Sequence, residues 1–322
     1  MPKFEAAGVR LYAISYDDKR ALREFAEKQS IPFPLLSDVK SEVIRRYGIL
    51  NDAIDKSDAF LFGIPFPGAY VTDEAGKVVS RFFHQSYKKR DSPEVLLDAA
   101  LGRIEIDEAA PRATGGESGV RIEAAVHGGR GTIRQGVVRQ LVVSFELEPG
   151  LHLYTDPVPE GLTATQVRVS GPPGFVTADP ILPATKTLRH EGLGVDLETW
   201  EGRFEIVVPF HADGRLASET RPLDTETASV EVEVRYQACN EVECLLPRAE
   251  TLRLEVPLDV VDVPKLGMHN GHGQREGLYD AMPHMRRLFL RKARENPVGI
   301  LSFAWKNFRM EREARRRLRD QG

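Results

Sequence analysis

Residues 229–238 (SVEVEVRYQA) decide the fold class of the larger part of this 322-residue chain. Valine and tyrosine alternate there with charged residues, and a period of two is typical of a strand with one buried face. TLRLEVPL at residues 251–258 alternates in the same way. Further strand patterns bounded by turn residues occur at residues 120–126, 137–147, 163–171 and 202–210. No helical pattern interrupts them, so residues 120–262 are predicted to form an antiparallel β-sandwich.

Residues 1–103 carry a different order of signals. Short apolar runs at residues 8–15 (GVRLYAIS) and 33–36 predict two strands, each followed by a helical pattern. Residues 68–72 and 77–83 predict a hairpin closed over the turn DEAG. The Ser-Pro pair at position 92 then predicts the start of a last helix. The order β-α-β-α-β-β-α indicates an α/β domain.

The helix boundaries in this first region follow from single residues. Asp18 precedes a helix that carries Leu22 and Phe25 on one face, and aspartate is a preferred N-cap. Ser41 is predicted to cap the next helix, and Gly48 is predicted to end it.

The rest of the chain divides by composition and charge. Residues 104–119, which include EAAPRATGGESG, are predicted to be a linker. Residues 263–322 are predicted to form a basic helical tail, with apolar residues at helical spacing from about Pro283. From Pro264 onward fourteen Lys or Arg face six Asp or Glu, a net charge of +8, whereas the whole chain carries −4. The tail is therefore expected to dock on the acidic remainder of the chain or to contact an anionic membrane surface peripherally.

Several classes of protein are disfavoured by these patterns. The overall charge of −4 predicts no nucleic-acid partner. No run of eighteen apolar residues occurs, so no transmembrane segment is expected. The first residues also lack the basic region, apolar core and cleavage site of a signal peptide.

The stretch YQACNEVECLLP at residues 236–247 holds both cysteines, Cys239 and Cys244. Zinc would need four ligands, and no second Cys/His cluster stands at a familiar spacing, so no metal and no cofactor is expected. A structural disulfide would close a loop of about six residues and stabilise the fold by only roughly 2 kcal/mol. A redox-active disulfide is the third possibility. Glu241 and Glu243 would raise a neighbouring thiol pKa, so the pair is better suited to be attacked than to attack.

The first region resembles a known family. AAGVRLYAISYDDKRALREFAEKQSIPFPLLSD, a following helix that ends in YGIL, and PGAYVTDEAGKVVSRF are similar to AhpC/TSA peroxiredoxins and related thioredoxin-fold redoxins over residues 4–101. The resemblance implies a thioredoxin-like domain. It also implies that the first strand and the helix with the reactive cysteine precede residues 8–15, so this domain is expected to be incomplete, with further residues upstream of Met1.

The same resemblance bears on activity. No cysteine precedes position 239, so peroxidase chemistry would depend on residues upstream of Met1. In thioredoxin-like folds the proline before the hairpin strand is usually cis and lines the partner groove, a role that would fall on Pro67. Otherwise Pro67 is an ordinary turn proline beside Pro65.

The second region resembles another family. PGLHLYTDP, TWEGRFEIVVPF and VRYQACNEVECLLP are similar to the N-terminal domain of the thiol:disulfide interchange protein DsbD over residues 120–260. The resemblance implies an immunoglobulin-like sandwich whose cysteines pass electrons between a thioredoxin-like protein and oxidised clients. Carried over, Cys244 makes the mixed disulfide and Cys239 resolves it.

The DsbD family also shields its disulfide with an aromatic cap loop. By position the cap would fall on residues 198–201, with Glu198 and with Trp200 as the aromatic residue. Trp200 could instead be a core residue of the sandwich. His152 and Tyr154 are expected near the same site, unless Tyr154 lies at a strand edge.

Together these observations predict a thiol-disulfide oxidoreductase that works through Cys239 and Cys244 in the periplasm or another extracytoplasmic compartment. Two alternatives stay open. The chain could be a non-catalytic binding scaffold with a degenerate redoxin domain, or a peroxiredoxin-type antioxidant enzyme if a cysteine lies upstream of Met1.

Overall fold

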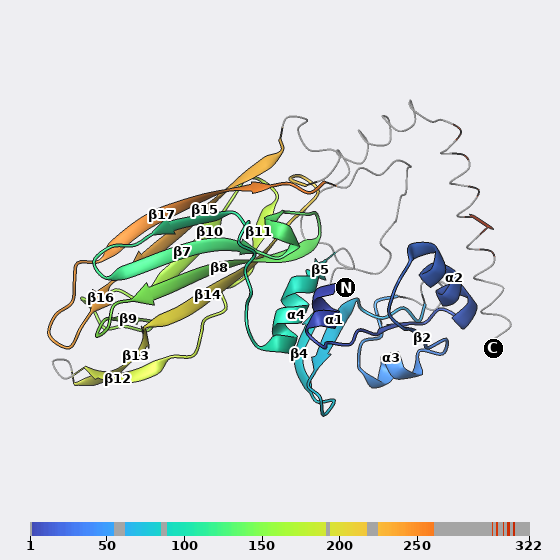
Figure 1. The fold of residues 1–322 in the computed structure, drawn as a ribbon, viewed down its shortest axis with the longest axis horizontal. Helices are drawn as coiled ribbons and strands as arrows, with labels where there is room; N and C mark the ends of the chain where they lie inside the picture. Colours follow the sequence, from blue (N-terminus) through green and yellow to red (C-terminus); the bar gives the residue numbers. More distant parts are fainter. Residues whose placement is uncertain are drawn as a thin grey trace. The chain divides into compact units, whose positions relative to one another are not determined.

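The computed structural model describes residues 2–54, 62–84, 89–190, 194–217 and 225–260, and six single positions between 298 and 312. The chain forms two compact units, which are described separately (Figure 1). One comprises Met1–Asp91, Leu96–Arg103 and Asp262–Gly322, and the other comprises Ser92–Val95 and Ile104–Val261.

The first unit follows the predicted α/β order. Its elements are α1 (Pro2–Ala6), β1 (Ala13–Ser15), α2 (Lys19–Gln29), β2 (Leu35–Ser37), α3 (Glu42–Arg46), β3 (Gly68–Thr72), β4 (Val78–Phe83) and β5 (Arg90–Asp91). Helix α4 (Pro93–Leu101) follows. From β1 to α4 these are the predicted elements, with the short strand β5 added. This order of elements agrees with the expectation of a thioredoxin-like domain.

Local hydrogen bonds explain where the helices begin. The Asp18 carboxylate accepts a hydrogen bond from the Ala21 backbone N–H at 2.8 Å, as an N-cap does. Helix α3 begins after Ser41 as predicted, but the Ser41 side chain does not cap it and donates to the Gly63 carbonyl instead. The Asp38 carboxylate takes the capping role, because it accepts from the backbone N–H groups of Glu42 and Ile44.

Four of the strands of this unit form two separate pairs. Strand β1 pairs in parallel with β2, and β3 pairs with β4 in an antiparallel hairpin. In the described part of the chain no strand joins the two pairs. Apolar side chains on or beside these strands remain exposed, among them Tyr12, Leu36, Val39, Val78 and Val79. Among the described residues, each strand pair therefore leaves apolar surface in contact with solvent.

The second unit is almost entirely β-structure. Its elements are β6 (Arg112–Gly115), β7 (Val120–His127), the 3-10 helix η1 (Gly129–Gly131), β8 (Val137–Leu147), β9 (His152–Tyr154), β10 (Gln166–Ser170), β11 (Phe175–Thr177), β12 (Lys186–His190), β13 (Val195–Glu201), β14 (Arg203–Ala212), β15 (Thr227–Tyr236), β16 (Ala238–Cys239) and β17 (Arg248–Pro257). These strands fall into three antiparallel sheets, with orders β11-β14-β8-β7-β6, β10-β15-β17 and β12-β13-β9-β16.

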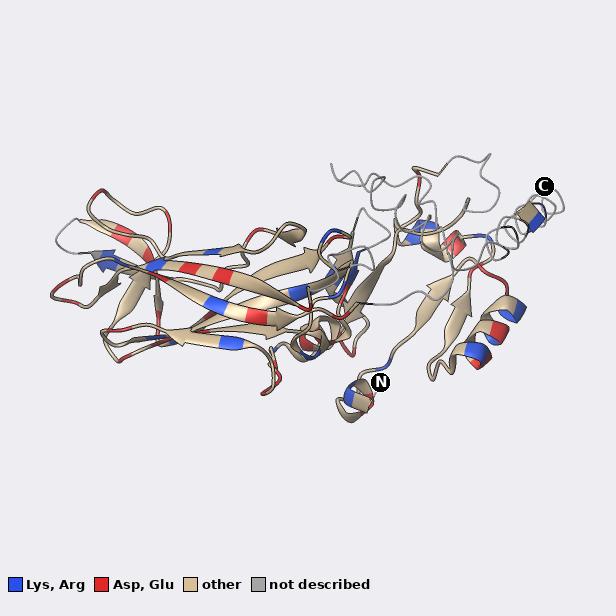
Figure 2. Cartoon of the chain, turned by 90° about the horizontal axis from the view of Figure 1, so that it is seen from above, with Lys and Arg blue, Asp and Glu red and all other residues tan. Residues whose placement is uncertain are grey.

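The predicted alternation places the core between these sheets. On β15 the residues Val230, Val232 and Val234 are buried, while the residues between them face outward. Phe145 of β8 pairs in register with Phe204 of β14, and their rings stack at 4.8 Å. Figure 2 shows acidic and basic residues interspersed along the strands, and Glu231 pairs with Arg253 across β15 and β17. The period of two thus separates an apolar core from a charged exterior.

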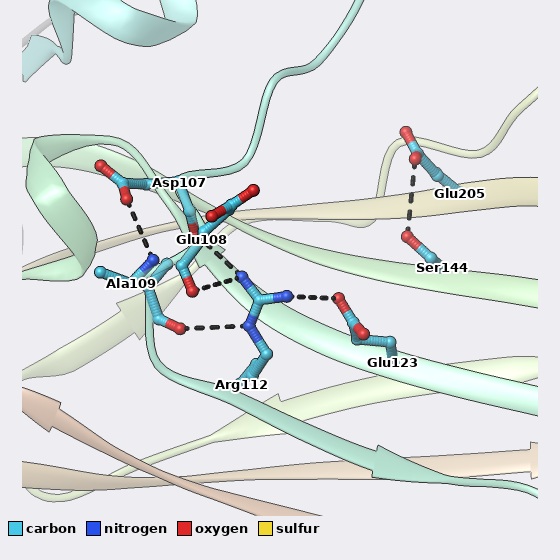
Figure 3. Close-up of polar contacts among 8 residues, drawn as sticks. Asp107, Glu108, Ala109, Arg112, Glu123, Ser144 and Glu205 are labelled. Carbon is cyan, nitrogen blue, oxygen red and sulfur yellow. Dashed lines mark hydrogen bonds and ion pairs between the residues drawn. The ribbon is translucent and has the colours of Figure 1, made fainter.

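Part of the predicted linker is a strand. Residues 112–115 form β6, which pairs with β7 at one end of the strand order β11-β14-β8-β7-β6, and Arg112 anchors the segment (Figure 3). The Arg112 guanidinium donates to the carbonyl oxygens of Asp107 and Glu108 and forms an ion pair with Glu123 at 3.3 Å. Composition alone marked this stretch as a linker, but strand pairing overrides the low strand propensity of its glycines.

The predicted basic helical tail lies outside the described residues except at six positions. Val298, Leu301, Trp305, Phe308, Arg309 and Arg312 are helical, and the four apolar side chains among them are exposed. No helix among the described residues is long and apolar enough to cross a membrane.

The buried ring of Phe145 allows a test of the core assigned to the second unit. Replacing this fully buried ring with alanine should lower the free energy of unfolding of the second unit by about 3–5 kcal/mol, because the stacking partner Phe204 would face a cavity. Urea unfolding followed by Trp200 fluorescence measures the change, in a Trp305→Phe background that leaves Trp200 as the single tryptophan. Val176→Ala on β11, where the side chain is 36% exposed, is the control and should change stability by about 0.5 kcal/mol or less. Equal effects of the two substitutions would contradict the assigned core.

Candidate active site: the Cys239–Cys244 disulfide

The two cysteines form a disulfide across a tight hairpin, as the spacing allowed. Their Sγ atoms are bonded, and Cys239 and Cys244 are antiparallel bridge partners. The Asn240 side-chain carbonyl shapes the loop between them by accepting from the backbone N–H groups of Val242 and Glu243, both at 2.8 Å. An asparagine that hydrogen-bonds its own backbone in this way holds a turn without other support. Asn240 therefore fixes the conformation of the loop between the two cysteines.

The two halves of the disulfide differ in exposure. Cys239 is completely buried, whereas Cys244 lies on the exposed loop. Val242 and Leu246, on either side of Cys244, are 91% and 79% exposed. Cys244 is therefore the half of the disulfide that lies at the surface, and Cys239 is the half that is enclosed. The exposed apolar neighbours offer a contact surface around the accessible sulfur.

Cys239 is covered on the side of its sheet that faces away from the main core. It packs with Tyr154 and Leu197 in a small apolar cluster, against which Val158 and Leu162 also pack. Val158 and Leu162 belong to residues 155–165, which connect β9 to β10 and are named the cover loop here. The cover loop thus shields the buried half of the disulfide and leaves Cys244 open.

Gln237 ties the cover loop to the hairpin. Its side-chain carbonyl accepts from the Thr163 backbone N–H at 2.8 Å, and its amide group donates to the Leu245 carbonyl at 3.0 Å. Gln237 is itself buried. Since one side chain satisfies backbone groups of both segments, a shift of the cover loop would disturb the residue next to Cys244.

Strand register brings His152 and Tyr154 to the site. His152 is directly opposite Cys239 in the pairing of β9 with β16. The His152 ring Nε2 and the Tyr154 hydroxyl lie 3.0 Å apart, and both side chains are buried. Burial raises the pKa of the Tyr154 hydroxyl above its ordinary value. Tyr154 therefore packs against Cys239 as a neutral phenol at neutral pH.

The residues expected to form the cap lie elsewhere. In the register of β13, β9 and β16, Trp200 aligns with Leu153 and Ala238, and all three belong to the main core. Cys239 points to the opposite face of the same sheet. Trp200 stacks on Phe204 at 5.1 Å, which is the core role that had been left open for it. The aromatic residue over the disulfide is Tyr154, together with the aliphatic residues of the cover loop.

Glu198 holds the neighbouring strand. Its carboxylate accepts hydrogen bonds from the hydroxyls of Thr185 and Thr187, and these bonds lower its pKa. Its backbone carbonyl accepts from the Thr155 N–H at 3.0 Å, which attaches the start of the cover loop to β13. Glu198 thus supports the cover loop through its backbone, while its side chain is directed to β12.

Pro67 precedes β3 in the first unit, and the described residues of that unit include no cysteine. Among the described residues the cis peptide bond is Asp156–Pro157, so the bond before Pro67 is trans, which agrees with the alternative of an ordinary turn proline.

Sequence reasoning missed Gln237, Asn240 and the cover loop. Gln237 and Asn240 stood beside the cysteines in the quoted motif, but their roles depend on which backbone groups lie within reach. A turn-forming asparagine next to a cysteine was a usable signal for Asn240. Nothing in the sequence of residues 155–165 indicated that they would fold over Cys239.

Comparison with known proteins agrees with this division of the chain. Residues 1–81 match the model of the AhpC/TSA family, and residues 130–256 match that of the N-terminal region of thiol:disulfide interchange protein DsbD. Chloroplastic peroxiredoxin Q from Sedum lineare is 33% identical over 100 residues, which cover 31% of this chain and 47% of the relative. The corresponding protein of Arabidopsis thaliana is also 33% identical over 100 residues, which cover 31% of this chain and 40% of that protein. The chain thus spans less than half of these relatives.

Among solved structures, the N-terminal domain of Neisseria meningitidis DsbD in its reduced form aligns with 49% of this chain and 98% of its own, at 14% identity and a TM-score of 0.25. The N-terminal periplasmic domain of ScsB from Proteus mirabilis aligns with 43% of this chain and 47% of its own, at 13% identity and a TM-score of 0.30. The two family models thus match separate parts of the chain: residues 1–81 are similar to the AhpC/TSA family, and residues 130–256 are similar to the N-terminal region of DsbD.

Proposed function

We propose that this protein is a thiol-disulfide oxidoreductase that exchanges two electrons with a thioredoxin-like protein through Cys239 and Cys244. The observation that carries the proposal is the asymmetry of the disulfide, with Cys244 exposed on a shaped loop and Cys239 buried under the cover loop. A structural staple has no need for one open sulfur. A disulfide that reacts with a partner needs one sulfur to be attacked and the other to leave.

The exchange can be written with its electrons balanced. A thiolate of the reduced partner attacks Cys244 Sγ, the Cys239–Cys244 bond breaks, and Cys239 leaves as a thiolate that takes up a proton. The partner's second thiolate then attacks its own sulfur in the mixed disulfide and releases Cys244. The partner is oxidised to a disulfide, and the cysteine pair is reduced by two electrons. The reverse steps would reduce an oxidised client.

The cover loop gives the exchange its selectivity. Small thiols could reach Cys244 from solvent, but the bond yields only if Cys239 can leave from beneath Val158 and Leu162. A partner that contacts Val242 and Leu246 gains binding energy that a small thiol lacks, and this energy can be used to loosen the cover. The protein would then react faster with proteins of the right surface than with glutathione.

The partner class and the compartment follow from the DsbD region. Proteins of the thioredoxin fold are the expected electron donors or clients, and the first unit would serve as a binding module because its described residues contain no cysteine. An extracytoplasmic location, such as the periplasm, is part of the same proposal. An exchange enzyme and a mere scaffold differ in one measurable respect, the formation of mixed disulfides.

Trapping tests the proposal directly. The Cys239→Ser chain, with thionitrobenzoate attached to Cys244, should form a stable mixed disulfide with a thioredoxin whose resolving cysteine is replaced by serine. The reaction is followed by thionitrobenzoate release and by non-reducing electrophoresis. Because Cys239 is buried, the matched Cys244→Ser chain should react with the labelling reagent about tenfold more slowly or less. Equal labelling of the two chains, or no adduct with thioredoxin, would favour the scaffold.

Loosening the cover loop should lower selectivity. Leu162→Ala removes a contact over Cys239, and losing up to about 1.4 kcal/mol of packing would speed reduction by glutathione up to about tenfold. The rate is measured in the otherwise intact chain by alkylation and mass spectrometry. Leu182→Ala, a leucine that is 52% exposed and not part of the cover, should leave the rate unchanged. A Leu162→Ala chain that reacts like the parent would show that the cover loop does not protect the bond.

The apolar surface around Cys244 should affect the rate of reduction by protein reductants and not the rate of reduction by small thiols. Leu246→Glu should slow reduction by reduced thioredoxin about three- to tenfold, because a charge would replace an apolar contact, and should leave reduction by dithiothreitol within about twofold of the parent. Leu182→Glu is the control for an added charge elsewhere. Equal slowing with both reductants would place the effect in the disulfide itself and refute a docking role for Leu246.

A further inference from the structure

Three side chains form a row across the sheet that holds the disulfide. Strand β9 lies between β13 and β16, and His152 is the register partner of Glu201 on one side and of Cys239 on the other. Directly paired residues of antiparallel strands project to the same face, with Cβ atoms about 4.5–5.5 Å apart. Glu201, His152 and Cys239 therefore stand next to one another in that order.

The row lies on the covered face of the sheet. Leu153, the residue after His152, points into the main core with Trp200 and Ala238. Because neighbouring residues of a strand point to opposite faces, His152 shares the face of Tyr154 and Cys239. His152 is only 5% exposed, and Cys239 is fully buried. The imidazole and the sulfur thus meet in a space from which water is largely excluded.

That environment raises a chemical problem for the proposed exchange. When the disulfide opens, the electron pair of the bond goes to Cys239 Sγ and a thiolate forms in an apolar cluster. Burial without a partner destabilises a thiolate and raises the thiol pKa. The cluster around Cys239 consists of Tyr154, Leu197, Val158 and Leu162, none of which carries a positive charge. A cation or a proton donor beside the sulfur would remove the difficulty.

The groups placed against His152 suit it for that task. On its own strand the Tyr154 hydroxyl lies 3.0 Å from Nε2, on β13 it faces Glu201, and on β16 it faces Cys239. The Glu201 carboxylate also forms an ion pair with Lys186 of β12 at 2.9 Å. The register thus places a carboxylate on one side of the imidazole and the Cys239 sulfur on the other, and the Tyr154 contact orients the ring.

We propose that His152 is the proton donor and acceptor for Cys239, with Tyr154 and Glu201 as positioning residues. The inference rests on the proposed exchange reaction, which leaves the proton of Cys239 unassigned. When the partner thiolate attacks Cys244, the imidazolium of His152 gives its proton to the departing Cys239 sulfur. In the reverse direction neutral His152 takes the proton from the Cys239 thiol, and the resulting thiolate attacks Cys244 Sγ of the mixed disulfide. Each full turn returns His152 to its starting state.

The thiolate fraction of Cys239 tests the inference without any partner. In the Cys244→Ser chain, absorbance at 240 nm against pH reports the single remaining thiol. Adding His152→Gln should lower the thiolate fraction at neutral pH about tenfold, because the neighbouring cation is lost. His127→Gln, at a buried histidine whose register partner on β8 is Gln140, is the matched control and should leave the titration unchanged. A titration unaffected by His152→Gln would overturn the inference.

Two further measurements keep the test independent of folding and of the proposed function. In the Cys244→Ser chain with His152 intact, the His152 ring resonances should shift as Cys239 ionises, because two adjacent groups titrate as a pair. If the His152 ring resonances do not shift as Cys239 ionises, the contact is refuted, even if the His152→Gln chain fails to fold. In the chain with both cysteines, His152→Gln should also remove one step from the pH dependence of reduction by dithiothreitol. An intact coupling in a chain that forms no mixed disulfide with thioredoxin would reject the proposed function and leave the His152 assignment standing.

Discussion

The candidate site depends on the pairing of β9 with its two neighbours. All three residues of β9, His152 to Tyr154, pair with β13 on one edge, and His152 and Leu153 also pair with β16 on the other. That register sends Leu153, Trp200 and Ala238 into the main core and sends His152, Tyr154 and Cys239 to the opposite face. Since the side-chain period of a strand is two, a shift by one residue would exchange these sets. It would bury the imidazole in the apolar core and move Cys239 away from the cover loop.

The disulfide is therefore asymmetric because of its place at the end of this sheet. Cys239 lies on a paired strand and is buried with it, whereas Cys244 follows an exposed loop whose turn is shaped by Asn240. Gln237 then connects the cover loop with the residue after Cys244. Strand, loop and cover are joined by hydrogen bonds to backbone groups. Access to the bond and stability of the hairpin are consequently controlled by the same contacts.

Much of the architecture was predictable because it rests on periodicity. The alternation in β15 and β17 and the order of strands and helices before residue 101 appear in the structure as expected. Two expectations were wrong where a tertiary contact overrides a local preference. Residues 112–115 form an edge strand through pairing with β7, and Asp38 replaces Ser41 as the capping side chain because Ser41 donates to the Gly63 carbonyl. Each depends on a partner that composition cannot identify.

For the site, the sequence by itself determined which atoms can undergo thiol chemistry, because the chain contains two cysteines and a five-residue separation lets a hairpin bring them together. It also placed His152 and Tyr154 close to them through the resemblance of the surrounding motifs. Only the tertiary structure decided which sulfur is exposed, what covers the other one, and that Glu201, His152 and Cys239 stand in one row. The physical reason is that burial and register depend on β9 with the cover loop that follows it, on β13 and on β16, three segments that are far apart in sequence and meet only when the sandwich closes.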